Sequence, residues 1–203
     1  MGSTVNLSRW FALTVLICIC WPLSVQAQSS SLKISEKTKH YNISGKTAAE
    51  FARSMSRKGP YSRQHRRRAW ATATRNMTYQ LVHRKSKKRC RIKAARVKME
   101  IVYEMPKLRS TAGVSKRQRA RWKKMLNLLN KHERTHGLYY RQFAKKVHRS
   151  LLKMKSASSC RGLERNAAKL VDSLSLADKK RNAKFDRADA RNYRRMEKIY
   201  SGS

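Results

Sequence analysis

Acidic residues are scarce in this chain. It has 11 Asp and Glu against 50 Lys and Arg in 203 residues, which gives a formal net charge of +39. A positive field of this size attracts polyanions of any kind, including nucleic acid, acidic envelope polymers and anionic lipid. The basic runs at residues 66–68 and 84–91 are not interleaved with the aromatic pattern of a known nucleic-acid-binding module. The charge is compatible with a nucleic-acid or envelope-polymer partner, but it does not name one.

The chain also lacks a hydrophobic run that is long enough to span a bilayer comfortably. The apolar run at residues 10–23 is short for that purpose. It follows the positively charged Arg9 and precedes Val25-Gln26-Ala27, a short segment that resembles a signal-peptidase cleavage site. Together these features form the pattern of a signal peptide. We therefore expect residues 1–27 to be a signal peptide, residues 28–203 to form a single domain, and the mature protein to be periplasmic or secreted. An uncleaved membrane anchor is the alternative.

Cysteine is rare, and no C-x-x-C spacing is present. Cys18 and Cys20 lie in the predicted signal peptide, which leaves Cys90 and Cys160 in the mature chain. Single cysteines that are far apart in the sequence are poor candidates for metal ligands. Two cysteines in an exported domain most often pair. We predict a disulfide between Cys90 and Cys160.

The strongest chemical motif is His132-Glu133-Arg134-Thr135-His136, an H-E-x-x-H sequence. Residues four apart lie one above the other on a helix, so both imidazoles can bind one zinc ion while Glu133 lies beside it. Catalytic zinc lowers the pKa of its bound water to about 7, and a neighbouring carboxylate can then take the proton. The motif predicts zinc as the cofactor, His132 and His136 as ligands, and Glu133 as the general base. The alternative is a pair of surface histidines on a basic helix.

Alternating apolar residues predict strands at residues 39–44, at residues 69–83 and from residue 90 to Pro106, where the last strand is expected to end. The alternation changes parity within the second of these strands. It changes again near Ala95, where one extra residue indicates a β-bulge. Residues 28–36 are expected to be flexible, and residues 61–68 to be a basic loop.

Two capping boxes predict helix starts, Thr47 with Glu50 and Ser115 with Gln118. The second helix carries the H-E-x-x-H motif, and the sequence after residue 156 is helical in composition. Gly137 lies inside the second helix at a cost of about 1 kcal/mol relative to Ala, which indicates close packing or a kink. The predicted fold class is α+β, with a small antiparallel sheet followed by an active-site helix and C-terminal helices.

The order of these features resembles a bacterial family of predicted secreted zinc-dependent proteases, domain of unknown function 922. The resemblance is carried by Tyr41-Asn42-Ile43-Ser44-Gly45, a Trp-containing strand, a Cys before a strand that ends in Pro, the H-E-x-x-H motif and a later Cys. It covers roughly residues 39–193. It implies a zincin-like α+β domain with His132 and His136 as zinc ligands and Glu133 as base.

The same family also carries an aromatic-Asp segment followed by Thr-x-His-Gly near its end. Phe185-Asp186 resembles the start of that segment, whereas Asp189, Arg191 and Asn192 stand where Thr, His and Gly would be. This departure leaves a catalytic role of the segment without support. A zinc protease nevertheless needs a third protein ligand. The candidates are Glu164, Asp172, Asp186 and Asp189, and we favour Asp186 because of the aromatic-Asp match.

Two functions remain open from the sequence. The first is an exported zinc metallopeptidase, which hydrolyses peptide bonds through a zinc-activated water with Glu133 as general base. The second is a cationic envelope or nucleic-acid binding protein whose zinc site is structural or degenerate. Metal content and the effect of replacing Glu133 separate the two.

Overall fold

The structure, a computed structural model, describes residues 29–62 and 66–201, and only the backbone of residues 193 and 195–201. The predicted signal peptide, residues 1–27, lies outside this part of the chain. The elements are strand β1 (Ser31–Ile43), helix α1 (Ala48–Lys58), strands β2 (Tyr61–Ser62), β3 (Arg67–Arg68), β4 (Thr72–Lys85) and β5 (Cys90–Leu108), and helices α2 (Lys116–Leu152) and α3 (Cys160–Ser201). None of the helices in the described ranges combines the length and the apolar composition that a membrane-spanning segment needs.

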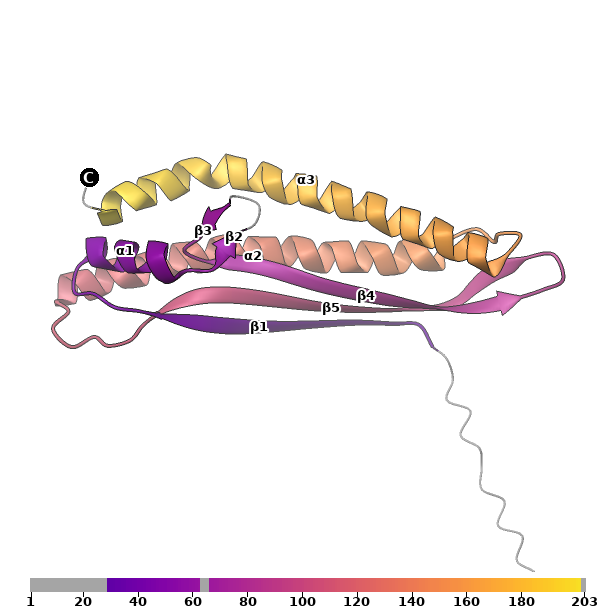
Figure 1. The fold of residues 1–203 in the computed structure, drawn as a ribbon, viewed down its shortest axis with the longest axis horizontal. Coiled ribbons are helices and arrows are strands. Elements are labelled where there is room, and N and C mark those ends of the chain that lie inside the picture. The colour runs from indigo at the N-terminus through magenta and orange to yellow at the C-terminus, as the bar shows by residue number, and fades with distance from the viewer. Residues whose placement is uncertain (1–28, 63–65, 202–203) are drawn as a thin grey trace, which may run out of the picture.

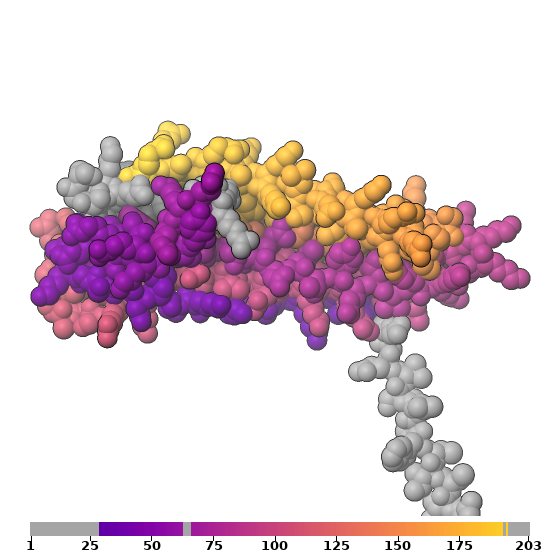
Figure 2. Space-filling model, in the orientation of Figure 1, coloured from indigo at the N-terminus to yellow at the C-terminus, as the bar shows by residue number. Residues whose placement is uncertain are grey.

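The main sheet has the strand order β1-β5-β4, and the helices lie on one side of it (Figure 1). Alternate side chains of β5 are buried against α2, including Val97, Met99, Ile101 and Tyr103. Helix α3 returns antiparallel to α2 and lies over it, and the tip of the β4–β5 hairpin extends past the amino-terminal end of α3 (Figures 1 and 2). The α+β fold class predicted from the sequence is confirmed.

The sheet is mixed rather than antiparallel. β4 pairs with β5 in an antiparallel hairpin, whereas β1 pairs with β5 in parallel, from Ser31 opposite Arg96 to Ile43 opposite Leu108. Strand β1 begins well before the predicted start at residue 39, so the prediction of a flexible segment at residues 28–36 is wrong for Ser31 onward. Leu32 and Ile34 alternate toward the core there, and pairing with the long β5 supplies the backbone partners.

The predicted bulge is present, but the predicted end of β5 is wrong. The β4–β5 register shifts between Val82 and His83, which leaves Lys93 without a partner, close to the expected site at Ala95. No change of parity occurs within β4. Strand β5 continues through Pro106 to Leu108 because pairing with β4 already ends at Glu104, so the missing N–H of Pro106 removes no hydrogen bond to β4.

Both predicted helix starts are confirmed. The Thr47 hydroxyl accepts a hydrogen bond from the Glu50 N–H, and the Ser115 hydroxyl accepts one from the Gln118 N–H. The C-terminal segment is one long helix, α3, rather than several helices. The expected basic loop at residues 61–68 contains the short antiparallel pair β2–β3, with residues 63–65 outside the described part.

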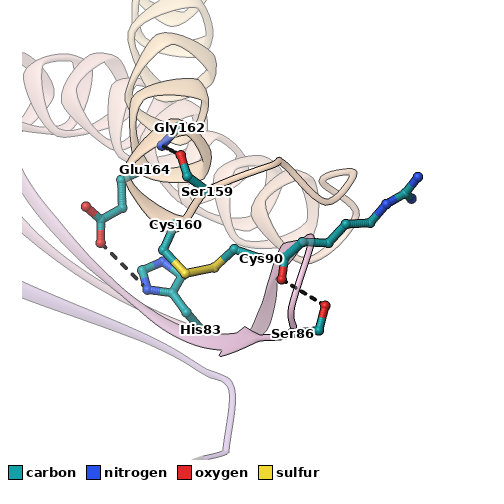
Figure 3. The surroundings of a disulfide bond; sticks show 8 residues. His83, Ser86, Cys90, Ser159, Cys160, Gly162 and Glu164 are labelled. Atoms are coloured by element: carbon teal, nitrogen blue, oxygen red, sulfur yellow. Dashed lines mark hydrogen bonds and ion pairs between the residues drawn. A yellow bond between two sulfur atoms is a disulfide. The ribbon is translucent and has the colours of Figure 1, made fainter.

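The predicted disulfide joins Cys90 to Cys160 (Figure 3). It lies where β5 begins, beside two backbone hydrogen bonds that Cys90 exchanges with Ala157 in the α2–α3 connection. The bond therefore links the hairpin end of the sheet to the first turn of α3.

Gly137 is required by close packing of α2 against β5. A Cβ at this position would lie 1.8 Å from the hydroxyl oxygen of Tyr103, whose side chain is fully buried. The Tyr103 hydroxyl donates a hydrogen bond to Glu36 of β1, which also accepts hydrogen bonds from Arg134 and Arg141 of α2. These contacts fix the distance between α2 and the sheet. They confirm the prediction that Gly137 marks a site of close packing.

We expect Gly137→Ala to destabilise the fold by about 1–3 kcal/mol, because overpacking outweighs the gain in helix propensity. Chemical denaturation measures this change. The control is Gly162→Ala in α3, where the nearest atom to an added Cβ is the Ser159 hydroxyl oxygen at 3.1 Å, on a short side chain at the surface. A Gly137→Ala protein that is as stable as the native one would contradict the packing described above.

Candidate metal centre

Three side chains from two helices converge on one point. His132 and His136 stand one turn apart on α2, and Asp186 reaches them from the antiparallel helix α3. The Asp186 Oδ1 atom lies 2.9 Å from His136 Nε2 and 3.6 Å from His132 Nε2, and the two Nε2 atoms are 3.2 Å apart. These three side chains could hold a metal ion. Among the described residues, they form the one cluster of three or more potential metal ligands.

The second ring nitrogens are held as a metal site requires. His132 Nδ1 lies 2.7 Å from an Asp189 carboxylate oxygen, and His136 Nδ1 lies 2.6 Å from the amide oxygen of Asn182. A neutral imidazole that donates its Nδ1–H to an oxygen has a lone pair on Nε2 that can bind a metal. Two nitrogens about 2.1 Å from one tetrahedral zinc ion stand about 3.4 Å apart, close to the separation seen here. The residues therefore fit a zinc-like metal, although their geometry does not identify the ion.

Hydrogen bonds within α3 orient the two residues that contact the second ring nitrogens, Asn182 and Asp189. Asn182 donates a hydrogen bond to the Asp178 carbonyl, and Asn192 donates one to the second oxygen of Asp189. Asn182, Asp186 and Asp189 recur at four- and three-residue steps, which places them on one face of the helix. Asp189, a candidate ligand from the sequence, instead supports His132. Asn182 was missed, and its only sequence signal is this spacing.

Glu133 lies next to the centre and is almost completely enclosed, with 4% of its surface exposed. Burial raises the pKa of Glu133, and the neighbouring imidazoles and the N–H of Ala73 in β4 offset part of this rise. The carbonyl of the same Ala73 accepts a hydrogen bond from the Tyr140 hydroxyl. Both backbone groups of Ala73 thus contact side chains of α2, and its N–H holds Glu133 beside the two histidines.

The ionisation of Asp186 suits cation binding, whereas the raised pKa values of the two histidines oppose it. Partial burial opposes ionisation of Asp186, but hydrogen bonds from His132 and His136 outweigh it and hold the pKa of this carboxyl well below its usual range. Burial lowers the pKa of each imidazole, and hydrogen bonds to Asp186, with support from Asp189 or Asn182, outweigh it and raise both pKa values. Protons and a metal ion therefore compete for the same two nitrogens.

Aromatic rings enclose one side of the centre. The Phe185 ring lies 4.8 Å from the His132 ring and 5.1 Å from the His136 ring, and Tyr139 contacts its edge. The Arg181 guanidinium covers Tyr139. This wall lowers the local dielectric and strengthens the charge interactions inside.

The remaining candidates from the sequence lie elsewhere. Glu164 faces His83 at 3.6 Å beside the disulfide (Figure 3). Asp172 lies near Tyr79 of β4, where burial first and then the charge of Asp172 raise the pKa of the phenol. Neither reaches the histidines. Cys90 and Cys160 are bonded to each other and are not ligands. The sequence-based choice of Asp186 is the one that the geometry supports.

Comparison with curated proteins and with solved structures gave no match. A family model described as "Bacterial protein of unknown function (DUF922)" matches residues 38–192. The matched segment includes α1, all of β4 and β5, α2 and the part of α3 that carries Asn182, Asp186 and Asp189. Because the match covers most of the chain, this protein belongs to the bacterial DUF922 family of unknown function.

Proposed function

We propose that this protein is an exported zinc-dependent metallopeptidase. The observation that carries the proposal is the convergence of two imidazole nitrogens and one carboxylate oxygen next to the enclosed Glu133. The Cys90–Cys160 disulfide supports export, because disulfides persist in oxidising compartments. The family description leaves the activity open, so the chemistry rests on these residues alone.

His132, His136 and Asp186 would hold the zinc ion, and Asp189 and Asn182 would keep the imidazoles in the ligating tautomer. Bound zinc supplies Lewis acidity, which polarises a peptide carbonyl and acidifies a water molecule. Glu133 accepts the proton of the attacking water and returns it to the leaving amine. The raised pKa of Glu133 suits both steps, since a base closer to neutrality can take a proton and give it back.

A purely structural metal that pins α3 to α2 is the second candidate. Structural zinc sites are usually closed by four protein ligands, whereas catalytic sites keep a position for water. Within the described residues, three ligating side chains converge, and the fourth neighbour, Glu133, is held by Ala73. A centre with three protein ligands rather than four favours a catalytic metal ion over a structural one.

The test begins with metal content. Purified mature protein should hold about one zinc ion per chain and hydrolyse a casein-type substrate. Removal of zinc by a chelator should abolish hydrolysis, and added zinc should restore it. His136→Ala should lose the metal, because it removes a ligand. His40→Ala, at an exposed position on β1, is the matched control and should keep it.

Two results would overturn the proposal. Native protein that binds zinc tightly but hydrolyses no peptide substrate would indicate the structural site. Hydrolysis that persists after complete removal of the metal would show that the three ligands take no part in the reaction.

A further inference from the structure

The sheet has a second face, turned away from all three helices. Its residues alternate with the buried ones, so Lys98 and Arg96 of β5 point away from the core that Val97 and Met99 enter. Six cations lie on the half of this face nearest the β4–β5 turn. This outer cationic face comprises Lys33, Arg84, Arg91, Lys93, Arg96 and Lys98.

Strand register brings like charges together on the outer cationic face. Lys33 of β1 pairs directly with Lys98 of β5, and Arg84 of β4 pairs directly with Arg91 of β5. Adjacent strands lie about 4.8 Å apart, and like charges placed opposite each other destabilise a sheet. Arg96 and Lys93 fill the interval between these two pairs. The fold therefore keeps an unfavourable arrangement of charge that an anion would relieve.

No ion pair in the described part of the chain neutralises any of the six. The acidic residues of this face, Glu100 and Glu104, lie on the other half, where Glu100 is paired with Lys37. The strand register thus places the acidic residues of this face on one half and leaves the other half with cations alone. The overall net charge does not determine this separation. This separation makes the outer cationic face different from an evenly basic surface.

The side chains around these cations indicate the chemistry of a partner. Ser31, Thr78 and Gln80 lie beside Arg96 and Lys98 in the same cross-strand rows and can exchange hydrogen bonds with hydroxyl groups. Aromatic residues, on which bases stack, do not occur among the described residues on the half of this face that carries the six cations. Val82, the apolar side chain of β4 on this half, is partly buried, so this half offers no large exposed apolar side chain that could insert into a bilayer.

We infer that the outer cationic face binds a linear anionic polysaccharide, one whose sugar units carry sulfate, phosphate or carboxylate groups. The cations follow a strip a few strands wide and roughly 20 Å long, given about 3.3 Å per strand residue. A single flexible chain can follow the twist of such a strip, with its charges on the cations and its hydroxyls on the Ser, Thr and Gln side chains. This inference is independent of the proposed peptidase, because it uses none of the metal-centre residues.

The test compares two variants of equal charge. The face variant carries Lys33→Thr, Arg91→Thr, Arg96→Thr and Lys98→Thr, which suit strands. The control variant carries Lys123→Gln, Lys124→Gln, Lys145→Gln and Lys146→Gln, all exposed on α2. Calorimetry with a heparin octasaccharide at physiological salt should show that the face variant binds on the order of tenfold or more weakly, with a log K against log salt slope shallower by about three to four. The control should bind nearly as native, because charges beyond about 8 Å are screened.

Circular dichroism and zinc content should match the native protein in both variants, which separates this test from that of the peptidase. Equal losses in the two variants would overturn the inference in favour of diffuse attraction by net charge. Tighter, face-dependent binding to duplex DNA with the same number of anionic groups would assign the face to nucleic acid instead. Face-dependent binding to phosphatidylglycerol vesicles, with none to heparin, would assign it to a membrane and also overturn the inference.

Discussion

Glu133→Gln is expected to reduce peptide hydrolysis by roughly 10²- to 10⁴-fold, the usual contribution of a general base. The substitution keeps the size of the side chain and one oxygen that can accept the Ala73 N–H, but it removes the proton acceptor. The zinc ligands are unchanged, so the metal should stay bound. The measurements are kcat/KM on a peptide substrate and zinc content on the same preparation.

The matched control for this prediction is Glu104→Gln, the same change on the outer side of β5 and remote from the two histidines. It should leave both kcat/KM and zinc content as in the native protein. If Glu133→Gln retains native kcat/KM with zinc bound, then Glu133 is not the base. If it loses zinc as well as activity, its role is to support the metal centre rather than to move a proton.

Removal of the Cys90–Cys160 disulfide is expected to lower the free energy of unfolding by about 4 kcal/mol, since the bond closes a long loop. The two residues are 70 apart in the sequence, and the loop contains strand β5 and all of α2. For a domain of this size the loss corresponds to a fall in Tm of roughly 8–16 °C. The double variant Cys90→Ala with Cys160→Ala avoids a buried polar group at Cys90, which is fully enclosed.

Thermal unfolding of the double variant, compared with native protein with and without reducing agent, measures the effect. Native protein under reducing conditions should unfold close to the double variant. A double variant with native Tm would show that the Cys90–Ala157 backbone bridge and the packing of α3 hold the two helices without the covalent link.

The local part of the metal centre could be predicted from the sequence, because a helix fixes the spacing of His132, Glu133 and His136. Asp186 was identified with the help of a family resemblance and not from spacing alone. Asn182 and Asp189 could not be assigned to their roles, because those depend on how α3 lies across α2. Helix packing of this kind is set by tertiary contacts such as Phe185 against the imidazoles, which no local pattern encodes.

The fold shows the same division between local and distant information. Capping residues and alternation predicted α1, the start of α2 and the bulge in β5, since each depends on neighbours in sequence. The parallel pairing of β1 was missed because its partner β5 lies far along the chain and because Lys33, Ser35 and Lys37 dominate its composition. Pro106 was read as a strand end, although a strand edge without a partner tolerates proline.

The parallel pairing of β1 with β5 imposes an order on how the chain can assemble. The β4–β5 hairpin closes through a short turn, whereas β1 meets its partner only after the intervening helix and strands have been made. Loop-closure entropy makes such distant pairing slow. A chain that emerges amino-terminal end first therefore holds β1 as a solitary strand for a time. During that wait, the lysines along one face of β1 oppose its association with strands of other molecules.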